Sequence, residues 1–139
     1  NPKWIPNNLM PYVFSVAKGE RKYLDIFGND YNTKDGTAIR DYVDINDIVE
    51  WHILALKQNN SGFNALNLGK WFWISVLDIV KVTELVTGNK IPYKFSSRRK
   101  GDIWEFYADP SLANLLLWWK ATIPLEISIQ NWWKFVNMP

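Results

Sequence analysis

The chain has 139 residues, a formal net charge of +2 and no cysteine. That length suits one domain with a sizeable core, the near balance of charge gives no electrostatic case for nucleic acid, and the lack of cysteine excludes disulfides and thiolate metal sites. No apolar run reaches the length of a membrane span and no signal-peptide pattern opens the chain, so we expect a soluble, cytoplasmic protein without a nucleic-acid or membrane partner. Nine tryptophans against seven glycines are abnormal; one hypothesis is a carbohydrate-binding surface, where indole faces stack on sugars.

The first half of the chain alternates between helical and extended patterns. Apolar spacing predicts a helix from Asn8 to Lys18, capped by Asn7 or Asn8 and ended by Gly19. Strands are predicted at 23–27, around 40–43 and at 63–68, with a polar loop at 29–37 between the first two. Between the second and third strands, a helix capped by Asp44 or Asn46 runs to about Lys57. Its expected apolar face carries Ile45, Ile48, Val49, His52 and Leu56, which makes His52 more readily a core residue than a catalytic one.

The second half continues the alternation. Ser75 and Asp78 form a capping-box pattern, and the helix behind them ends at Gly88. A short strand at 91–95 and a basic loop at 96–102 follow. Asp109 and Pro110 open a short helix, and 122–124 open a last helix. Helices and short strands alternate without repeats, which predicts a mixed α/β fold in a single unit, residues 1–139.

Arg40 is the clearest candidate for a binding residue. It lies on a predicted strand beside a wide polar loop, and its charge should not be buried without an anionic partner. It is therefore a plausible phosphate or carboxylate clamp; the alternative is a solvated surface arginine. No Gly-rich phosphate turn, Ser/His/Asp set, metal-ligand spacing or carboxylate pair stands out. The residues alone predict no catalytic, cofactor-binding or metal site in this chain.

Seven segments together resemble the C-terminal half of UDP-glucose 4-epimerases, members of the extended short-chain dehydrogenase/reductase family. They are residues 5–12, 27–43, 67–69, 75–80, 98–102, 107–111 and 119–122. The similarity covers essentially the whole chain in one register, and the long loop at 29–37 favours the epimerase branch over related dehydratases and decarboxylases. The resemblance implies the C-terminal mixed α/β substrate-binding part of such an enzyme, with the N-terminal Rossmann half absent.

The same resemblance implies a function. The family interconverts UDP-glucose and UDP-galactose through a 4-keto intermediate, with NAD and the catalytic Tyr-x-x-x-Lys in the N-terminal half. This chain would then only anchor the UDP-sugar and be inactive alone, and the parent enzyme would be a homodimer. The alternatives are another nucleotide-sugar dehydratase or decarboxylase, and a non-enzymatic, tryptophan-rich sugar-binding module.

Nine positions are implied as substrate-binding residues. Asn8 and Leu9 correspond to pyrophosphate contacts, and Asp25, Ile26 and Phe27 to a strand edge that pairs with uracil through its backbone. Arg40 and Arg99 correspond to two phosphate clamps, and Asp102 to the carboxylate that holds the ribose hydroxyls. Phe106 corresponds to a wall beside the sugar's 2-substituent, where a large ring restricts the enzyme to plain hexoses. Asp44 departs from the family, which usually has histidine there.

The resemblance also bears on the tryptophans. Trp4, Trp51, Trp71, Trp73 and Trp118 stand where the family characteristically has glycine, and Trp104 and Trp132 are further candidates, whereas Trp119 and Trp133 match family tryptophans. Trp118 follows a short helix, where a left-handed residue is expected and glycine is strongly favoured. We expect the codons of Trp4, Trp51, Trp71, Trp73 and Trp118 to be UGA, which the source organism would read as glycine.

Overall fold

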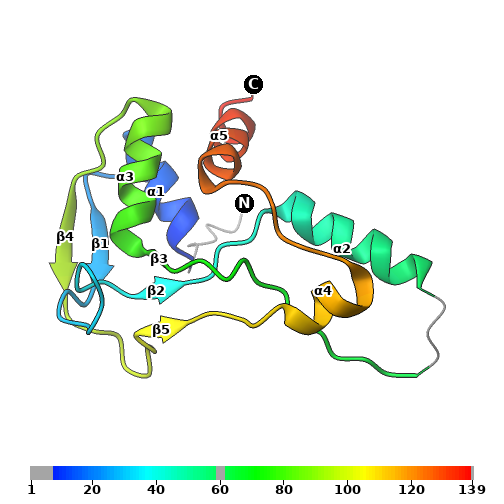
Figure 1. The fold of residues 1–139 in the computed structure, drawn as a ribbon. Helices are drawn as coiled ribbons and strands as arrows, with labels where there is room; N and C mark the ends of the chain where they lie inside the picture. Colours follow the sequence, from blue (N-terminus) through cyan, green and yellow to red (C-terminus); the bar gives the residue numbers. More distant parts are fainter. Residues whose placement is uncertain (1–7, 59–61, 139) are drawn as a thin grey trace, which may run out of the picture.

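The computed structural model describes residues 8–58 and 62–138; predictions attached to Trp4 and Asn7 lie outside these residues. Its elements, in chain order, are α1 (Leu9–Ala17), β1 (Leu24–Phe27), β2 (Ile39–Arg40), α2 (Ile45–Lys57), β3 (Ile74–Ser75), α3 (Val76–Thr87), β4 (Tyr93–Ser96), β5 (Glu105–Phe106), α4 (Ser111–Leu117) and α5 (Leu125–Val136). Helices and short strands alternate along an elongated molecule (Figure 1). The predicted mixed α/β class is confirmed.

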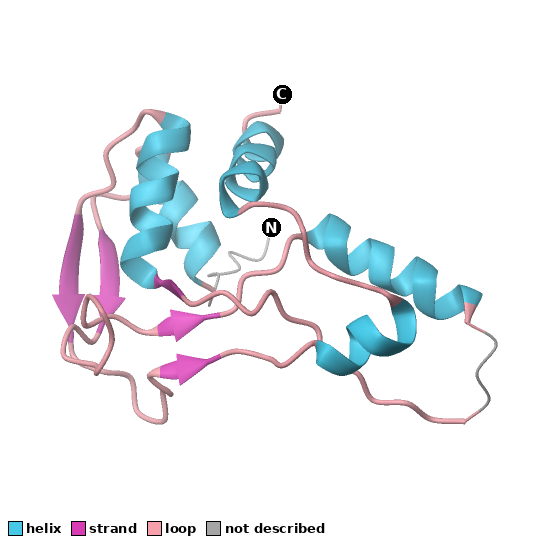
Figure 2. Ribbon diagram, in the orientation of Figure 1, coloured by secondary structure: helices cyan, strands magenta, loops and turns pink. Residues whose placement is uncertain are grey.

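Two small sheets organise one end of the molecule. β1 and β4 form a parallel pair, and β2 lies between β3, to which it is antiparallel, and β5, to which it is parallel. Helices α1, α3 and α5 gather beside these sheets, while α2 and α4 lie at the far end (Figure 2). Within the described residues, no second strand pairs with the other edge of β1.

Each end of the molecule has its own core. The larger core packs α1 and α3 against β1; its most buried members are Val13, Ile26, Ile79 and Ile91, each at most 2% exposed. The smaller core is built around Trp119, which is 1% exposed, with Ala113 and Leu117 of α4 and partly buried residues of α2. Burial of these apolar side chains is the main stabilising term for both ends.

Several helix boundaries follow the sequence signals. Ser75 and Asp78 form the predicted capping box, and Gly88 ends α3 in the left-handed conformation. Asp44 caps α2 by accepting the backbone N–H of Asn46 at 2.8 Å. A carboxylate in that place satisfies a helix-end donor, which gives a local reason for Asp44. Among the described residues, no helix is long and apolar enough to cross a membrane.

The predicted face of α2 was wrong. Ile45 is 66% and Leu56 86% exposed, and α2 instead turns Asp47, Trp51 and Leu54 toward the smaller core. His52 is correspondingly exposed rather than a core residue, and its Nδ1 lies 2.7 Å from the carbonyl oxygen of Ile48 in its own helix. The apolar pattern of α2 misled because apolar residues lie on both of its sides: Val49 and Ile53 are exposed like Ile45 and Leu56, whereas Trp51, Leu54 and Ala55 pack against the smaller core.

The strand predicted at 63–68 is also wrong. In its described residues this segment is irregular, because no neighbouring strand pairs with it. β2 is shorter than predicted and ends at Arg40, and β5 was not predicted. Two-residue strands owe their existence to their partners, so they leave no pattern of alternation in the sequence.

Tryptophans occupy very different environments. Trp132 stacks on the buried ring of Phe14, with 5.5 Å between ring centroids. Trp51 is partly buried against the smaller core, and its Nε1 is buried with no hydrogen-bond partner among the described residues. Trp73 is 57% exposed, and the centroid of its ring lies 5.7 Å from that of Tyr107.

Candidate functional site

A cavity of about 850 Å³ opens between the β1 edge and the strand β2. It is lined by residues from α1, β1, β2, the start of α3, the 96–102 loop and α5. Eight of the nine sequence-derived binding residues line it: Asn8, Leu9, Asp25, Ile26, Phe27, Arg40, Arg99 and Asp102. The ninth, Phe106, is not among its lining residues; it pairs with Arg40 across β2 and β5 and is 63% exposed.

The unpaired edge of β1 forms one wall. Leu24 and Gly28 donate their backbone N–H groups toward β4, at 2.8 and 2.9 Å. Backbone groups of alternate residues point to opposite edges of a strand, so those of Asp25 and Phe27 face away from β4. The side chain of Asp25 is held on the β4 side, by the Ser96 hydroxyl at 3.0 Å and the Lys94 ammonium at 3.3 Å. This wall therefore offers peptide N–H and C=O groups, which suit a planar heterocycle with its own donor and acceptor.

Two arginines reach the cavity from different directions. Arg40, at the end of β2, donates from Nη2 to Asp102 at 2.8 Å and from Nη1 to the carbonyl oxygen of its neighbour Ile39 at 2.7 Å. Arg99 comes from the loop after β4, and its guanidinium lies 3.9 Å from the centroid of the Phe27 ring. Among the described residues, Arg99 makes no ion pair. A guanidinium stacked on a ring keeps its N–H edge open to an anion.

The ion pair of Arg40 and Asp102 joins two segments that are 62 residues apart. The two side chains are only 28% and 29% exposed. Because β5 pairs with β2 immediately after the loop that carries Asp102, the strand pairing brings this carboxylate to the arginine. Asp102 consequently neutralises Arg40 and leaves three of its four oxygen lone-pair sites for other donors, such as hydroxyl groups.

The first turn of α1 closes another side of the cavity. Asn8 is the N-cap residue, and its side chain makes no capping hydrogen bond. The first turn carries no acidic residue, so its free N–H groups and the positive end of the helix dipole are not neutralised from within the helix. The first turn of α1 and the two arginines therefore make this end of the cavity suitable for an anion.

The sequence did not reveal every residue of the cavity. Arg21 lies over the ring of Tyr12 at 4.5 Å, and both line it. Tyr42 also lines it; burial raises its pKa to about 12, against a smaller lowering by Arg40, so it presents a neutral hydroxyl. Arg21 follows a helix stop with no strand or motif around it, and nothing in its local sequence marks it.

A polar network fixes the loop that precedes β2. Thr37, fully buried, donates its backbone N–H at 2.9 Å and its hydroxyl at 2.7 Å to Asp35, and the Ser75 hydroxyl donates to the same carboxyl group. Burial raises the pKa of Asp35, but these hydrogen bonds outweigh it and leave the pKa below its usual value. Asp35 is thus ionised at neutral pH and ties the loop to the start of α3, which fixes the direction in which β2 presents Arg40.

Asp41, the residue directly after β2, ties together three segments of the chain. Its two carboxylate oxygens accept the backbone N–H groups of Lys70, at 3.0 Å, and of Ala108, at 3.3 Å. A Cβ on Gly69 would lie 2.4 Å from the Asp41 carboxylate and 2.9 Å from the Ala108 carbonyl oxygen, so only glycine allows this close approach. Three segments therefore meet at one carboxylate directly after Arg40.

Comparison with known proteins places this arrangement in a family. The sequence profile of the NAD dependent epimerase/dehydratase family matches residues 1–69. The chain is 47% identical over 137 residues to UDP-glucose 4-epimerase of Bacillus subtilis and 45% identical over 137 residues to that of Homo sapiens. The chain belongs to the NAD dependent epimerase/dehydratase family.

These matches cover 97% of this chain but only 40% and 39% of the two relatives, so the chain spans about two-fifths of their length. Solved structures of relatives in this epimerase family superpose well. The UDP-glucose 4-epimerase of Stenotrophomonas maltophila, solved with NAD and formylated UDP-arabinopyranose, gives a TM-score of 0.90 at 38% identity, covering 99% of this chain and 42% of that one. The UDP-glucose 4-epimerase of Bifidobacterium longum, solved with NAD+ and UDP, gives a TM-score of 0.87 at 40% identity, covering 99% of this chain and 42% of that one. The expected C-terminal portion of an extended short-chain dehydrogenase/reductase is confirmed.

Proposed function

We propose that this chain is the UDP-sugar-binding part of a UDP-glucose 4-epimerase, which interconverts UDP-glucose and UDP-galactose. The observation that carries the proposal is the convergence of Arg40, Arg99 and the β1 edge on one cavity. A uracil base would pair with the peptide groups of β1 beside Phe27, and the diphosphate would lie between the two guanidinium groups and the first turn of α1. Asp102, already fixed by Arg40, would accept the ribose hydroxyls.

NAD is the cofactor that this family implies, and the chain's own residues do not fit it. The sequence contains no Gly-x-Gly-x-x-Gly turn after a strand, the feature by which dinucleotide-binding folds seat a pyrophosphate. We therefore assign NAD and the hydride transfer to the part of the protein that the relatives have beyond this chain. The expected homodimer and the cytoplasmic location also belong to that whole protein and are part of the proposal.

In this proposal the role of the chain is to hold one end of the substrate. Charge-assisted hydrogen bonds from two arginines fix the diphosphate, while the sugar projects beyond it toward Phe106 and the remainder of the enzyme. A keto-sugar intermediate tethered only through its diphosphate is free to present either face to the hydride donor. The anchor thus serves both half-reactions without changing its contacts.

The proposal is tested with the full-length protein and with this chain alone. The full-length protein is expected to convert UDP-galactose to UDP-glucose in a coupled spectrophotometric assay. The chain alone is expected to show neither this activity nor NAD binding, because it contains neither the general base nor a dinucleotide turn. Tight NAD binding by the isolated chain, or a full-length protein that leaves UDP-galactose unchanged, contradicts the proposal.

Phe106 supports a second expectation, about substrate range. Its Cα lies opposite that of Arg40 on the neighbouring strand, so a sugar attached to a diphosphate on Arg40 extends past its ring. A large ring beside the sugar takes up the space that an acetamido group would need, and an overlap there costs strain. The full-length enzyme is expected to turn over the UDP-N-acetylhexosamine pair at least about tenfold more slowly than the plain pair, a discrimination of about 1.4 kcal/mol.

The substitution Phe106→Cys is expected to raise turnover of UDP-N-acetylglucosamine selectively, measured as the ratio of kcat/KM values for the two pairs. Phe135→Cys, at a similarly exposed ring on α5 (67% exposed), is the matched control and is expected to leave the ratio unchanged. Equal turnover of both pairs by the unmodified enzyme would show that Phe106 is not a gate.

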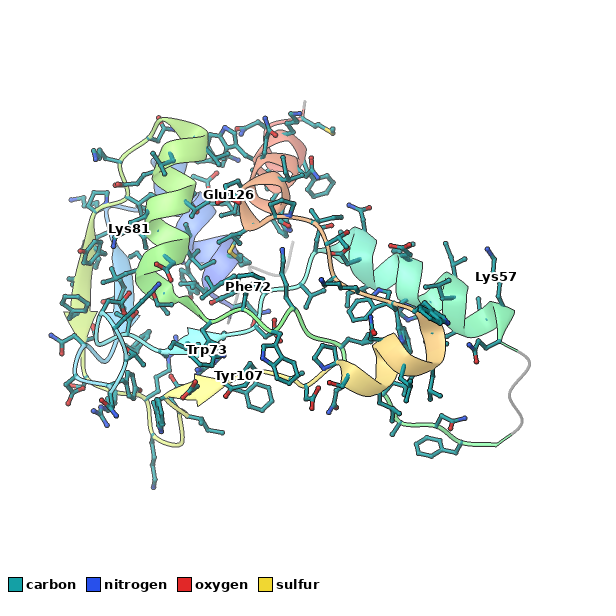
Figure 3. The ribbon with its side chains drawn as sticks, viewed as in Figure 1. Lys57, Phe72, Trp73, Lys81, Tyr107 and Glu126 are labelled. Carbon is teal, nitrogen blue, oxygen red and sulfur yellow. The ribbon has the colours of Figure 1, made fainter. Side chains whose placement is uncertain are left out.

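A non-enzymatic sugar-binding module is the second candidate. The observation in its favour is a group of exposed aromatic side chains around Phe72, Trp73 and Tyr107 (Figure 3). Such a module would bind neutral oligosaccharides by stacking and would have no need of paired arginines. Binding of a neutral oligosaccharide but not of UDP is the result that favours it.

A further inference from the structure

The backbone at two tryptophans has the conformation of glycine. Among the described residues, positive φ angles occur at six glycines and at Trp71 (φ 57°) and Trp118 (φ 55°), and at no other residue type. The left-handed conformation that was expected at residue 118 is thus confirmed. In this region Cβ of an L-residue crowds the backbone, and bulky side chains are outliers there. Asn and Asp tolerate the left-handed conformation because their short polar side chains form local hydrogen bonds, whereas tryptophan has no short polar side chain.

The conformation at Trp118 is imposed by the helix that it ends. It is the C-cap of α4, with ψ 21°, and its N–H donates to the carbonyl oxygen of Asn114 at 2.8 Å. This left-handed closure satisfies carbonyl groups at the helix end and is most often made by glycine. Its indole is 89% exposed and takes part in no ring contact or hydrogen bond among the described residues. The strain is therefore not offset by burial of the side chain.

Trp71 likewise combines a positive φ angle with an exposed side chain. Two hydrogen bonds hold its neighbour Lys70. The backbone N–H of Lys70 donates to the Asp41 carboxylate, and its ammonium group donates to the carbonyl oxygen of Ile123. The indole of Trp71 is 52% exposed and makes no ring contact within the part of the chain that is described. Each such residue disfavours the folded state by a factor of about 5 to 30.

Trp119 shows what a fitting tryptophan looks like in this fold. It directly follows Trp118, but it is 1% exposed and its Nε1 donates to the carbonyl oxygen of Asp47 at 2.7 Å. Two adjacent tryptophans, one at the centre of a core and one on a strained, solvent-facing turn, do not share a structural cause.

We propose that residues 71 and 118 are glycine in the protein that the cell makes, because their codons are UGA and the source reads UGA as glycine. Two unrelated substitutions of glycine would have no reason to choose tryptophan both times. A single codon with two meanings does have such a reason: UGA is glycine in the source, and a genetic code that reads UGA as tryptophan places tryptophan at every such position. It also accounts for nine tryptophans beside only seven glycines. Trp119 would be encoded by UGG.

This inference bears on the exposed aromatic group. Without an indole at residue 71, the surface beside Phe72 and Trp73 loses an aromatic neighbour. The surplus of tryptophan then gives no support to a stacking platform for neutral sugars. The positive φ angles, the exposure of the two indoles and the composition of the chain do not depend on the proposed epimerase function.

The decisive experiment is peptide sequencing of the protein purified from its own source. Trypsin cleaves after Lys100 and Lys120, so one peptide contains both Trp118 and Trp119; cleavage after Lys70 and Lys81 gives a second peptide that begins at Trp71. Tandem mass spectrometry is expected to read glycine at 118 and tryptophan at 119 in the same peptide, and glycine at 71. Tryptophan at 71 or 118 overturns the proposal.

A second measurement asks whether the fold itself prefers glycine. In protein expressed with tryptophan at both positions, Trp118→Gly is expected to raise the midpoint of thermal unfolding, by about 3 °C or more. The matched variant Trp119→Gly, one residue later, is expected to lower it by about 10 °C or more, since it empties a core. A lower midpoint for Trp118→Gly contradicts the inference.

Discussion

Replacing Arg40 by methionine is expected to weaken UDP binding to the full-length protein by about 10- to 150-fold. A hydrogen bond to a charged group contributes about 1.5–3 kcal/mol, and every 1.4 kcal/mol corresponds to about a factor of ten in affinity. Methionine retains much of the length of the apolar stem and removes the guanidinium that Asp102 holds at 2.8 Å. Isothermal titration calorimetry with UDP measures the loss.

The chain offers a matched control for this prediction. Arg98 is adjacent to Arg99 in sequence, but it pairs with Asp30 at 2.7 Å, lies over the ring of Tyr31 and does not line the cavity. Arg98→Met is expected to change UDP affinity less than about twofold, as exposed ion pairs contribute little. Uridine has no phosphate and should lose much less affinity than UDP in the Arg40→Met variant, its own loss being limited to the effect of releasing Asp102 from Arg40. An equal loss for uridine would mean that Arg40 acts on the fold rather than on phosphate.

The second large effect is expected at Asp47, which is 1% exposed on α2. Its carboxylate accepts the backbone N–H groups of Thr122, at 3.1 Å, and of Ile123, at 3.2 Å. Asp47→Ala leaves both donors without their partner in a part-buried place, at a cost of about 1–3 kcal/mol each. We expect the free energy of unfolding in urea to fall by roughly 2–6 kcal/mol, the sum for the two donors.

Glu50 lies one turn further along α2 and is exposed. Glu50→Ala is the control and is expected to stay within about 0.5 kcal/mol of the unmodified chain. If Asp47→Ala is as stable as Glu50→Ala, the tie between α2 and the segment before α5 does not hold the smaller core together. That segment also anchors Lys70, so loss of the tie is expected to loosen the connection that leads to β3.

How far the sequence predicted this site depended on the range of the contacts involved. Local signals worked: the capping box at Ser75, the left-handed ends at Gly88 and residue 118, and the helix that opens near Asn8 all depend on residues a few positions apart. The resemblance to a family then supplied residues as distant as Arg40 and Arg99, and the cavity brings these together.

Long-range contacts were out of reach of composition and periodicity. Nothing in the sequence around Arg40 indicates that Asp102 is its partner, because the contact depends on two-residue strands that exist only through each other. The packed face of α2 was missed for a related reason. Its buried side is chosen by Trp119 and the segment around Thr122, which attach to Asp47, and not by the count of apolar residues on the helix.

We propose that this chain anchors a uridine diphosphate, and a crystal structure of the full-length protein with UDP is the most direct test. We expect the uracil ring against the free edge of β1, paired with backbone groups of Asp25 and Phe27. We expect phosphate oxygens at about 2.7–2.9 Å from the guanidinium nitrogens of both Arg40 and Arg99. A diphosphate bound away from both arginines, or a base that does not contact β1, would contradict the account.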